Sequence, residues 1–203
     1  MRVAVLGAAG VLGCEVARRA MARGDEVVAL IRRSGSAPSG VSTEVVGDAR
    51  DGASIRAAIE GADAVIDTIG AGRLKKNNLE STVIAGVIDA MKELAVTRLI
   101  AMSAGMVART NPVLDYLLKP TLFRHILAEH EHLEEIVRRS GLRWTLVRPP
   151  KLTNRPARGY VTSTGPRYIG SMSIARHDVA QFIVDELARS AFIQQAVFVS
   201  SAP

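Results

Sequence analysis

Three glycines near the start of the chain have the spacing of a turn that binds a pyrophosphate. Gly7, Gly10 and Gly13 follow the apolar run at residues 3–6 and open an amphipathic segment. The first glycine permits a tight turn after a strand, the second lets backbone N–H groups approach the anion, and the third lets the helix pack closely on the sheet. The unpaired N–H groups and the dipole of the helix N-terminus would then hold the phosphates.

Glycines at this spacing also occur in ordinary turns between a strand and a helix, so the context decides between the two interpretations. Here an apolar strand precedes the turn, an amphipathic segment follows it, and a second strand ends near residue 32. This context favours a dinucleotide site over a plain turn. The residues of the turn expected to contact the cofactor are Gly7, Ala9, Gly10, Val11, Leu12 and Gly13.

The end of the second predicted strand indicates which dinucleotide is preferred. A site specific for NAD carries a carboxylate about 20 residues beyond the glycine turn. This chain has Arg32 and Arg33 there and no acid. Two guanidinium groups can hold the 2′-phosphate of NADP through paired hydrogen bonds, although two solvated arginines after a strand are also common. Since the acid is missing as well, the sequence predicts that NADP(H) is preferred over NAD(H).

Further candidate residues follow the third and fourth predicted strands, at the edge where open parallel sheets bind ligands. The carboxylate of Asp48 could accept a hydrogen bond from the adenine amino group, and Ala49 leaves space for the ring. The neighbouring Asp51 has a simpler explanation as the N-cap of the next helix. The loop after the fourth strand supplies the expected cofactor contacts Thr68, Ile69 and Gly70, and continues with Gly72 and Arg73.

The elements that position these residues alternate between short apolar strands and amphipathic helices, which is the pattern of βαβ units. Strands are expected at residues 3–6, 26–31, 43–46, 64–67, 98–102, 144–147 and 196–199, and helices at residues 11–23, 52–60, 79–94, 123–139 and 174–187. The predicted fold class is α/β, a doubly wound parallel sheet of the Rossmann type. It forms one NAD(P)-binding domain over residues 1–203, with small C-terminal elements at the substrate pocket.

The composition fits one globular domain with a substantial core, since 48% of the 203 residues are hydrophobic and 23% are charged. No apolar run approaches the roughly 18 residues that span a bilayer. The N-terminus does not have the pattern of a signal peptide. We therefore expect a cytoplasmic protein without a membrane partner. The single cysteine, Cys14, is expected to be a small packed side chain rather than a reactive thiol.

The formal net charge of +6 raises the question of nucleic acid binding. The basic residues are scattered, however, and aromatic residues make up only 4% of the chain, too few for platforms that stack on bases. A phosphate-bearing cofactor accounts for a few of these charges. The sequence therefore predicts small anionic ligands and no nucleic acid partner.

The histidines do not have the spacing of a metal site. His125 and His132 have no acids or cysteines at ligand spacing, so no metal is expected. His177 and Asp178 are adjacent on a predicted helix and therefore point apart, which argues against a catalytic dyad. We expect Asp178 instead to offset the charges of Arg176 and His177 near the helix start.

Five stretches together resemble the short-chain dehydrogenase superfamily, in its atypical NAD(P)H-binding, NmrA-like branch. The resemblance is closest to the flavin reductase/biliverdin-IXβ reductase group and extends along the whole chain. The matching stretches are residues 7–13 (GAAGVLG), 46–48 (VGD), 102–104 (MSA), 139–150 (RSGLRWTLVRPP) and 174–180 (IARHDVA). The glycine turn is shared across the superfamily, while the run from Ser140 to Pro150 and the pair His177-Asp178 are narrower signals.

This resemblance implies an NADPH-dependent reductase that transfers hydride to a flavin, a quinone or a similar flat conjugated acceptor. In that group the serine after the fifth strand, here Ser103, lies beside the nicotinamide. The residue after Pro149 and Pro150 borders the same pocket; better-studied members have His there, and this chain has Lys151. A lysine offers a hydrogen bond or a positive charge, but not the pKa of an imidazole. Ser103 and Lys151 are the candidate catalytic residues, and both, with the two prolines, are candidate cofactor contacts.

The chain departs from ordinary short-chain dehydrogenases in lacking their Tyr-x-x-x-Lys pair, in which the lysine lowers the pKa of the phenol. Ile126 and His130 stand where that pair belongs, and Tyr116 and Lys119 are three apart in a loop. Interconversion of alcohols and ketones is therefore not expected. Reduction of a flavin or quinone stays open because solvent can supply the proton.

Two functions remain open from the sequence. The first is the reductase, and the second is a redox sensor that binds NADP(H) without turnover, which the missing tyrosine favours. His130 is expected to be a structural histidine rather than a base, and Ser103 lacks the Gly-x-Ser-x-Gly turn of a hydrolase. The protein is expected to be a monomer or a homodimer.

Overall fold

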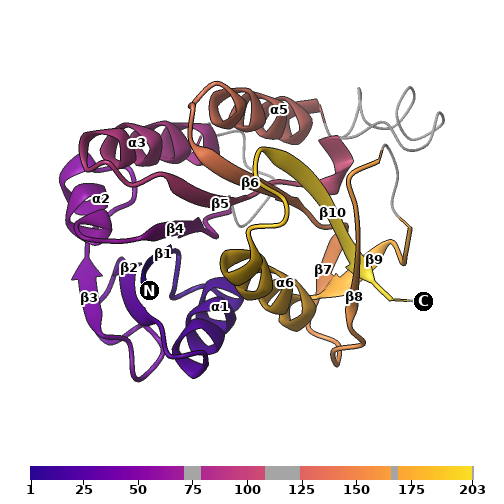
Figure 1. Cartoon of the computed structure of the whole chain (residues 1–203), viewed down its shortest axis with the longest axis horizontal. Helices are drawn as coiled ribbons and strands as arrows, with labels where there is room; N and C mark the ends of the chain where they lie inside the picture. The colour runs from indigo at the N-terminus through magenta and orange to yellow at the C-terminus, as the bar shows by residue number, and fades with distance from the viewer. Residues whose placement is uncertain (71–78, 108–123, 166–168, 203) are drawn as a thin grey trace.

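The computed structural model, shown in Figure 1, describes residues 1–70, 79–107, 124–165 and 169–202. Gly72, Arg73, Tyr116 and Lys119 lie outside the described residues. The centre is an eight-stranded sheet with helices on both faces. Its strand order is β3 (Thr43–Val46), β2 (Glu26–Ile31), β1 (Arg2–Leu6), β4 (Ala64–Asp67), β5 (Arg98–Met102), β6 (Arg143–Arg148), β10 (Gln195–Ser201) and β8 (Tyr160–Ser163).

Neighbouring strands are parallel from β3 to β10, and β8 pairs with β10 in the antiparallel sense. The chain runs outward from β1 to β2 and β3, then returns to β4 on the other side of β1. In a doubly wound sheet this reversal of strand order opens the crevice where ligands bind. The predicted fold class, a Rossmann-type parallel sheet, is confirmed.

The alternation of side chains along β1 divides the core into two layers. Val3 and Val5 pack with α1 (Val11–Ala22) and α6 (Arg176–Arg189). Ala4 and Leu6 point to the other face, which is covered by α2 (Gly52–Ile59), α3 (Leu79–Glu93) and α5 (Arg124–Arg138). All four strand residues are fully buried. Figure 1 shows α1 and α6 on one side of the sheet and α3 and α5 on the other.

A buried ion pair fixes α6 against the sheet. Arg98 in β5 donates to Glu186 in α6 at 2.8 Å and to the hydroxyl of Thr145 in β6 at 2.9 Å. Thr145 in turn donates to Glu186 at 3.0 Å. Moving α6 away would leave the charges of Arg98 and Glu186 buried without a partner, which is energetically costly. The ion pair therefore favours this one position of α6 on the sheet.

The region after Pro150 was the least predictable part of the fold. Strands β7 (Lys151–Thr153) and β9 (Ser173–Ala175) form a separate parallel pair, and β8 lies between them in the chain. A helix beginning at residue 174 was the wrong prediction there. Ile174 and Ala175 are buried in β9, and α6 begins at Arg176. Strands this short carry little periodicity, and their pairing depends on distant partners.

Most other predicted elements agree with the structure to within a few residues. In the described residues, no helix has both the length and the apolar character needed to cross a bilayer. A short 3-10 turn, η1 (Gly105–Val107), follows β5.

Candidate functional site

The glycine turn after β1 has the tight geometry that its sequence predicts. Gly7 has φ +81°, a conformation that residues with a Cβ rarely adopt. The N–H of Gly10 donates to the Gly7 carbonyl at 2.8 Å. A Cβ on Gly13 would collide with that same carbonyl oxygen and with the Thr68 hydroxyl. The glycines thus bring the start of α1 into direct contact with the ends of β1 and β4.

The N-terminus of α1 has the features of an anion site. Gly10 is its N-cap and provides no side-chain hydrogen bond, and the first turn contains no acidic residue. Val11, the first helical residue, is 65% exposed. Free backbone N–H groups and the helix dipole at this position favour a phosphate. The residues present therefore fit the pyrophosphate of a dinucleotide.

Arg32 and Arg33 lie at the neighbouring strand end. Leu30 of β2 is in register with Leu6 of β1, so both arginines follow a strand end next to Gly7. Both are exposed, and neither forms an ion pair within the part of the chain that the structure describes. Their guanidinium groups are available to a phosphate, as the NADP prediction requires.

Asp48 lies beyond β3 with its carboxylate already engaged. Arg50 donates to it from Nε at 3.0 Å, from Nη2 at 2.6 Å and from its backbone N–H at 2.9 Å. These bonds, with the charges of Arg50 and Arg32, lower the pKa of Asp48 to about 2. An adenine contact would have to share these oxygens, so the role predicted for Asp48 stays a prediction. Ala49 packs against the core layer of α2 and α3.

Asp51 is the N-cap of α2, as predicted, and accepts hydrogen bonds from the N–H groups of Ala53 and Ser54.

The loop after β4 is fastened to the glycine turn. The Thr68 hydroxyl donates to the Leu6 carbonyl at 2.8 Å, and the Ile69 N–H donates to Asp67 at 3.0 Å. The proton of the Thr68 hydroxyl is therefore directed to β1 rather than to a ligand. Gly70 is exposed where the described part of this loop ends. Cofactor contacts by residues 68–70 remain predictions.

Asp67 is a buried acid that the sequence interpretation did not single out. It ends β4 at 2% exposure, between Leu6 of β1 and Ala101 of β5. Burial, together with the charge of Glu80, raises its pKa to about 7, even though the Ile69 N–H stabilises the carboxylate. The sequence signal that could have indicated this buried acid is an aspartate at the end of an otherwise apolar strand. The structure places this titratable group at the switch point of the sheet.

Ser103 follows β5 and is held by a buried network. Its hydroxyl donates to Glu134 of α5 at 2.7 Å, and its N–H donates to the Val147 carbonyl at 2.8 Å. Glu134 also accepts from Nε of Arg148 at 2.8 Å and from Arg138 at 3.2 Å. Ser103 is 5% exposed and Glu134 is 3% exposed. Ser103 was a candidate from the sequence, but its bond to Glu134 was not.

Glu134 is ionised in this network. Burial alone would raise its pKa, but the hydrogen bond and charge of Arg148 and the hydrogen bonds from Ser103 and Arg138 together outweigh it. The net effect lowers the pKa of Glu134 below its usual value. A carboxylate accepts hydrogen bonds only, so the Ser103 hydroxyl must donate to it. Toward any ligand, Ser103 therefore offers acceptor lone pairs.

Lys151 is exposed at the start of β7, opposite Ser173 of β9. It forms no ion pair within the described residues, so its charge is available. The carbonyl of Pro149 accepts the N–H of Gly105 at 2.9 Å, which joins the end of β6 to the loop after Ser103. Pro149 is buried and Pro150 half-buried. Contacts of these residues with the cofactor or acceptor stay predictions.

The role of His130 as a structural histidine stays a prediction, whereas the contacts of Asp178 differ from those expected. Nδ1 of His130 lies 3.2 Å from Glu80, so this residue has an acidic neighbour between α5 and α3. The role predicted for Asp178 was wrong. Its carboxylate accepts the backbone N–H groups of Arg158 and Gly159 at 3.1 Å each, while His177 pairs with Glu15 at 3.0 Å. An aspartate in the first turn of a helix can accept hydrogen bonds from a loop that is distant in the sequence. The spacing of residues along the helix does not reveal such a contact.

Cys14 is half-buried. Its N–H donates to the Gly10 carbonyl as part of the first turn of α1.

Comparison with known proteins extends these observations. The curated relatives include the uncharacterized sugar epimerase YhfK of Bacillus subtilis, which is 29% identical over 92% of this chain and 88% of that protein. Three uncharacterized proteins of Mycobacterium bovis and Mycobacterium tuberculosis are 36% identical over 116 residues. That match covers 56% of this chain but only 13% of the length of those proteins.

Solved structures share the fold over nearly their whole length. A wide-type short-chain dehydrogenase/reductase of Veillonella parvula, in complex with NADP, has a TM-score of 0.84 at 17% identity, covering 100% of this chain and 94% of that one. A candidate NADH-flavin reductase of Streptococcus pneumoniae has a TM-score of 0.84 at 21% identity, covering 100% of both chains. A family model described as NAD(P)H-binding matches residues 7–190. Because this match runs from the glycine turn to the end of α6, which is most of the chain, the chain belongs to the NAD(P)H-binding family.

Proposed function

We propose that this protein is an NADPH-dependent reductase that transfers hydride to a flat conjugated acceptor such as a flavin or a quinone. One observation carries the cofactor half of the proposal. The uncapped N-terminus of α1 lies behind the glycine turn, and two arginines without ion pairs among the described residues follow the adjacent strand. This arrangement offers binding groups for a pyrophosphate and for a 2′-phosphate at one edge of the sheet.

The proposed cofactor contacts divide by the part of the ligand they would hold. The backbone N–H groups at the start of α1 would take the pyrophosphate, and Arg32 with Arg33 the 2′-phosphate. When bound, the reduced nicotinamide supplies the hydride. Ser103 lies after β5, further along the same edge, and would accept a hydrogen bond from the carboxamide with its free lone pairs.

The acceptor class follows from what Ser103 and Lys151 can do. The proton of Ser103 is held by ionised Glu134, so this hydroxyl is a poor general acid. Lys151 is exposed and, at the proposed border of the acceptor pocket, would supply a positive charge rather than an imidazole. Flavins and quinones accept hydride on a conjugated ring and can take the accompanying proton from water. An acceptor of this kind needs alignment from the protein more than acid catalysis.

The hydrogen bond that the Ser103 hydroxyl donates to Glu134 also favours a second candidate function. A protein that binds NADP(H) as a redox sensor needs the cofactor site without a proton donor. The two candidates share the glycine turn and the arginine pair, and they differ only in turnover.

Turnover is tested by following NADPH absorbance with a panel of riboflavin, FMN, a naphthoquinone and a dye. We expect NADPH oxidation with at least one of these acceptors. Ser103→Ala should lower kcat/KM, whereas Arg143→Ala, an exposed arginine at the opposite edge of the sheet, should not. Tight NADPH binding without oxidation across the panel would support the sensor, and failure to bind NADPH would refute both candidates.

A further inference from the structure

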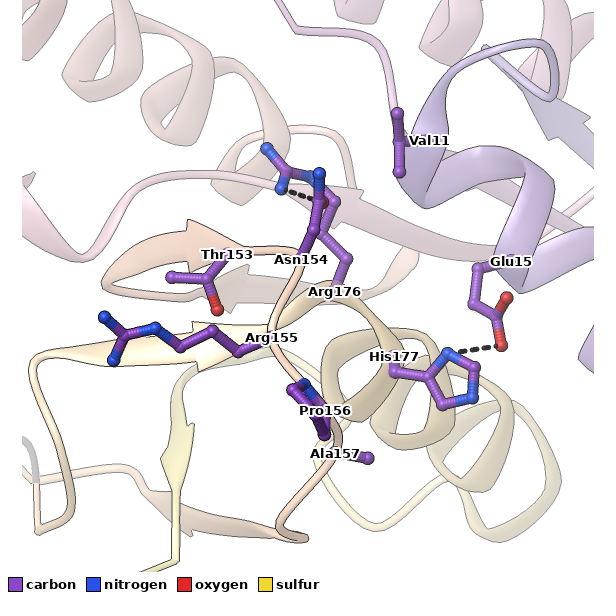
Figure 2. A pocket seen from close by; sticks show the side chains of 9 residues that line it. All are labelled: Val11, Glu15, Thr153, Asn154, Arg155, Pro156, Ala157, Arg176 and His177. Atoms are coloured by element: carbon purple, nitrogen blue, oxygen red, sulfur yellow. Dashed lines mark hydrogen bonds and ion pairs between the residues drawn. The ribbon is translucent and has the colours of Figure 1, made fainter.

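A pocket of about 420 Å³ lies beside the glycine turn (Figure 2). Val11 and Glu15 of α1 line one side of it, and the segment at residues 153–157 lines another. Arg176 and His177, the first two residues of α6, complete the lining. A volume of this size is typical of sites for small molecules. None of the roles discussed above uses these loop and α6 side chains.

The lining of this pocket carries uncompensated positive charge. Nη1 of Arg176 donates to the side-chain oxygen of Asn154 at 2.6 Å, a neutral partner that orients the guanidinium without cancelling its charge. Arg155 is exposed and has no ion pair among the residues that the structure describes. In Figure 2 the Arg155 side chain extends from the loop on the side away from Val11 and Glu15, and Arg176 extends toward Asn154. Guanidinium groups bind phosphates and carboxylates.

The acid in the lining does not neutralise these arginines. Glu15 accepts a hydrogen bond from Nε of Arg19 at 2.9 Å, one turn further along α1, and its other close partner is Nδ1 of His177 at 3.0 Å. Its charge is therefore offset by Arg19, which does not line the pocket. The charge that remains to attract a ligand is that of Arg155 and Arg176.

The pocket is built rather than a chance gap between loops. Asp178 binds the N–H groups of Arg158 and Gly159, and this holds the segment carrying Arg155 against α6. The adjacent Arg176 is tied to the same segment through Asn154. Residues 174–180 (IARHDVA) thus have a role that their sequence alone did not reveal. Arg176 and His177 line the pocket, and Asp178 holds the loop segment that lines another side of it.

We propose that this pocket binds the anionic group of the acceptor, so that the protein selects conjugated acceptors bearing a phosphate or carboxylate over neutral ones. This inference rests on the proposed reductase function and names its substrate class. Val11 belongs to both the glycine turn and the pocket, so an acceptor anchored here lies directly beside the dinucleotide site. Arg32 and Arg33 do not line the pocket, so the 2′-phosphate of the cofactor and the anionic group of the acceptor would have different arginine partners.

The test compares FMN with riboflavin, which share a ring system and differ by one phosphate. Binding to the full chain is measured by quenching of flavin fluorescence without NADPH, so the result does not depend on turnover. We expect FMN to bind roughly tenfold more tightly than riboflavin, and Arg155→Ala to weaken FMN by roughly tenfold with little effect on riboflavin. Arg176→Gln should act in the same direction. Arg158→Ala is the matched control, because it removes an exposed arginine of the same loop that does not line the pocket.

Three results would overturn the inference: equal affinity for the two flavins, binding of neither flavin, or equal weakening of both by Arg155→Ala. A loss of NADPH affinity in Arg155→Ala with FMN binding unchanged would also overturn it, since the pocket would then hold phosphates of the cofactor. Failure of the reductase proposal is a separate result, namely selective FMN binding without NADPH oxidation by any acceptor.

Discussion

Replacing Arg32 and Arg33 together by alanine should remove the discrimination between NADPH and NADH. Both side chains are exposed, and within the described residues neither forms an ion pair. The double substitution therefore breaks no ion pair among these residues and removes only the charge interaction of Arg32 with Asp48. The 2′-phosphate is the only group that NADPH has and NADH lacks, so a loss confined to NADPH reports directly on that phosphate.

The size of the effect follows from the exposure of the two arginines. A hydrogen bond to a charged group contributes about 1.5–3 kcal/mol, and solvent screening at exposed sites brings each arginine to about 1–2 kcal/mol. Two arginines then contribute about 2–4 kcal/mol, which at about 1.4 kcal/mol per factor of ten weakens NADPH roughly 30- to 1,000-fold. The affinity for NADH should change by less than about twofold, because no phosphate contact is lost.

Isothermal titration calorimetry of both cofactors with the wild type, the two single variants and the double variant measures this ratio. Arg143→Ala, exposed at the opposite edge of the sheet, controls for the loss of positive charge alone. Equal weakening of NADPH and NADH would refute the assignment, and so would an unchanged affinity for both. In either case the preference for NADP(H) would have to be assigned to other residues.

Three further predictions concern the groups around the turn. Gly13→Ala should weaken both cofactors and lower the free energy of unfolding by about 1–3 kcal/mol, because its Cβ meets the Gly7 carbonyl; Gly52→Ala, with ordinary contacts only, is the control in urea unfolding. Glu134→Ala should lower the free energy of unfolding by about 3–5 kcal/mol, because Arg148, whose side chain is only 15% exposed, loses its carboxylate partner; a loss below about 1 kcal/mol would contradict the ionised network. The pKa of Asp67 is about 7 in the folded protein against 3.8 ordinarily, so the folded state binds the extra proton and the wild type loses stability as the pH rises between these values. Asp67→Asn should therefore gain stability relative to the wild type by about 1.4 kcal/mol per pH unit across that range, and a difference in urea unfolding independent of pH would exclude this explanation.

The glycine turn and the strands around it were predictable because their signals are local. Strand β2 and the positions of Arg32 and Arg33 follow from an apolar run and its end, and the N-cap Asp51 from its place before a helix. The structure agrees with these predictions almost residue for residue. Local sequence specifies such elements because turn chemistry and hydrophobic periodicity act over a few residues.

The contacts that give the site its chemistry were not predictable in the same way. Ser103 and Glu134 are 31 residues apart in the chain, and their bond exists only because α5 packs beside the end of β5. Asp178 binds N–H groups 20 and 19 residues earlier. Strands β7 and β9, of three residues each, likewise pair directly although β8 lies between them in the sequence. Such contacts depend on tertiary packing, and no periodic pattern encodes them.

The interlocking of Gly7, Gly13 and Thr68 has a practical consequence for redesign. Because the first helix, the first strand and the tip of the fourth are fastened together there, this corner tolerates little alteration. The tip of the second strand is not part of that lock, since its arginines project into solvent. Under the proposed assignment, a laboratory that wishes to exchange one coenzyme for the other would therefore rewrite residues 32 and 33 and leave the proposed diphosphate site at residues 7–13 untouched.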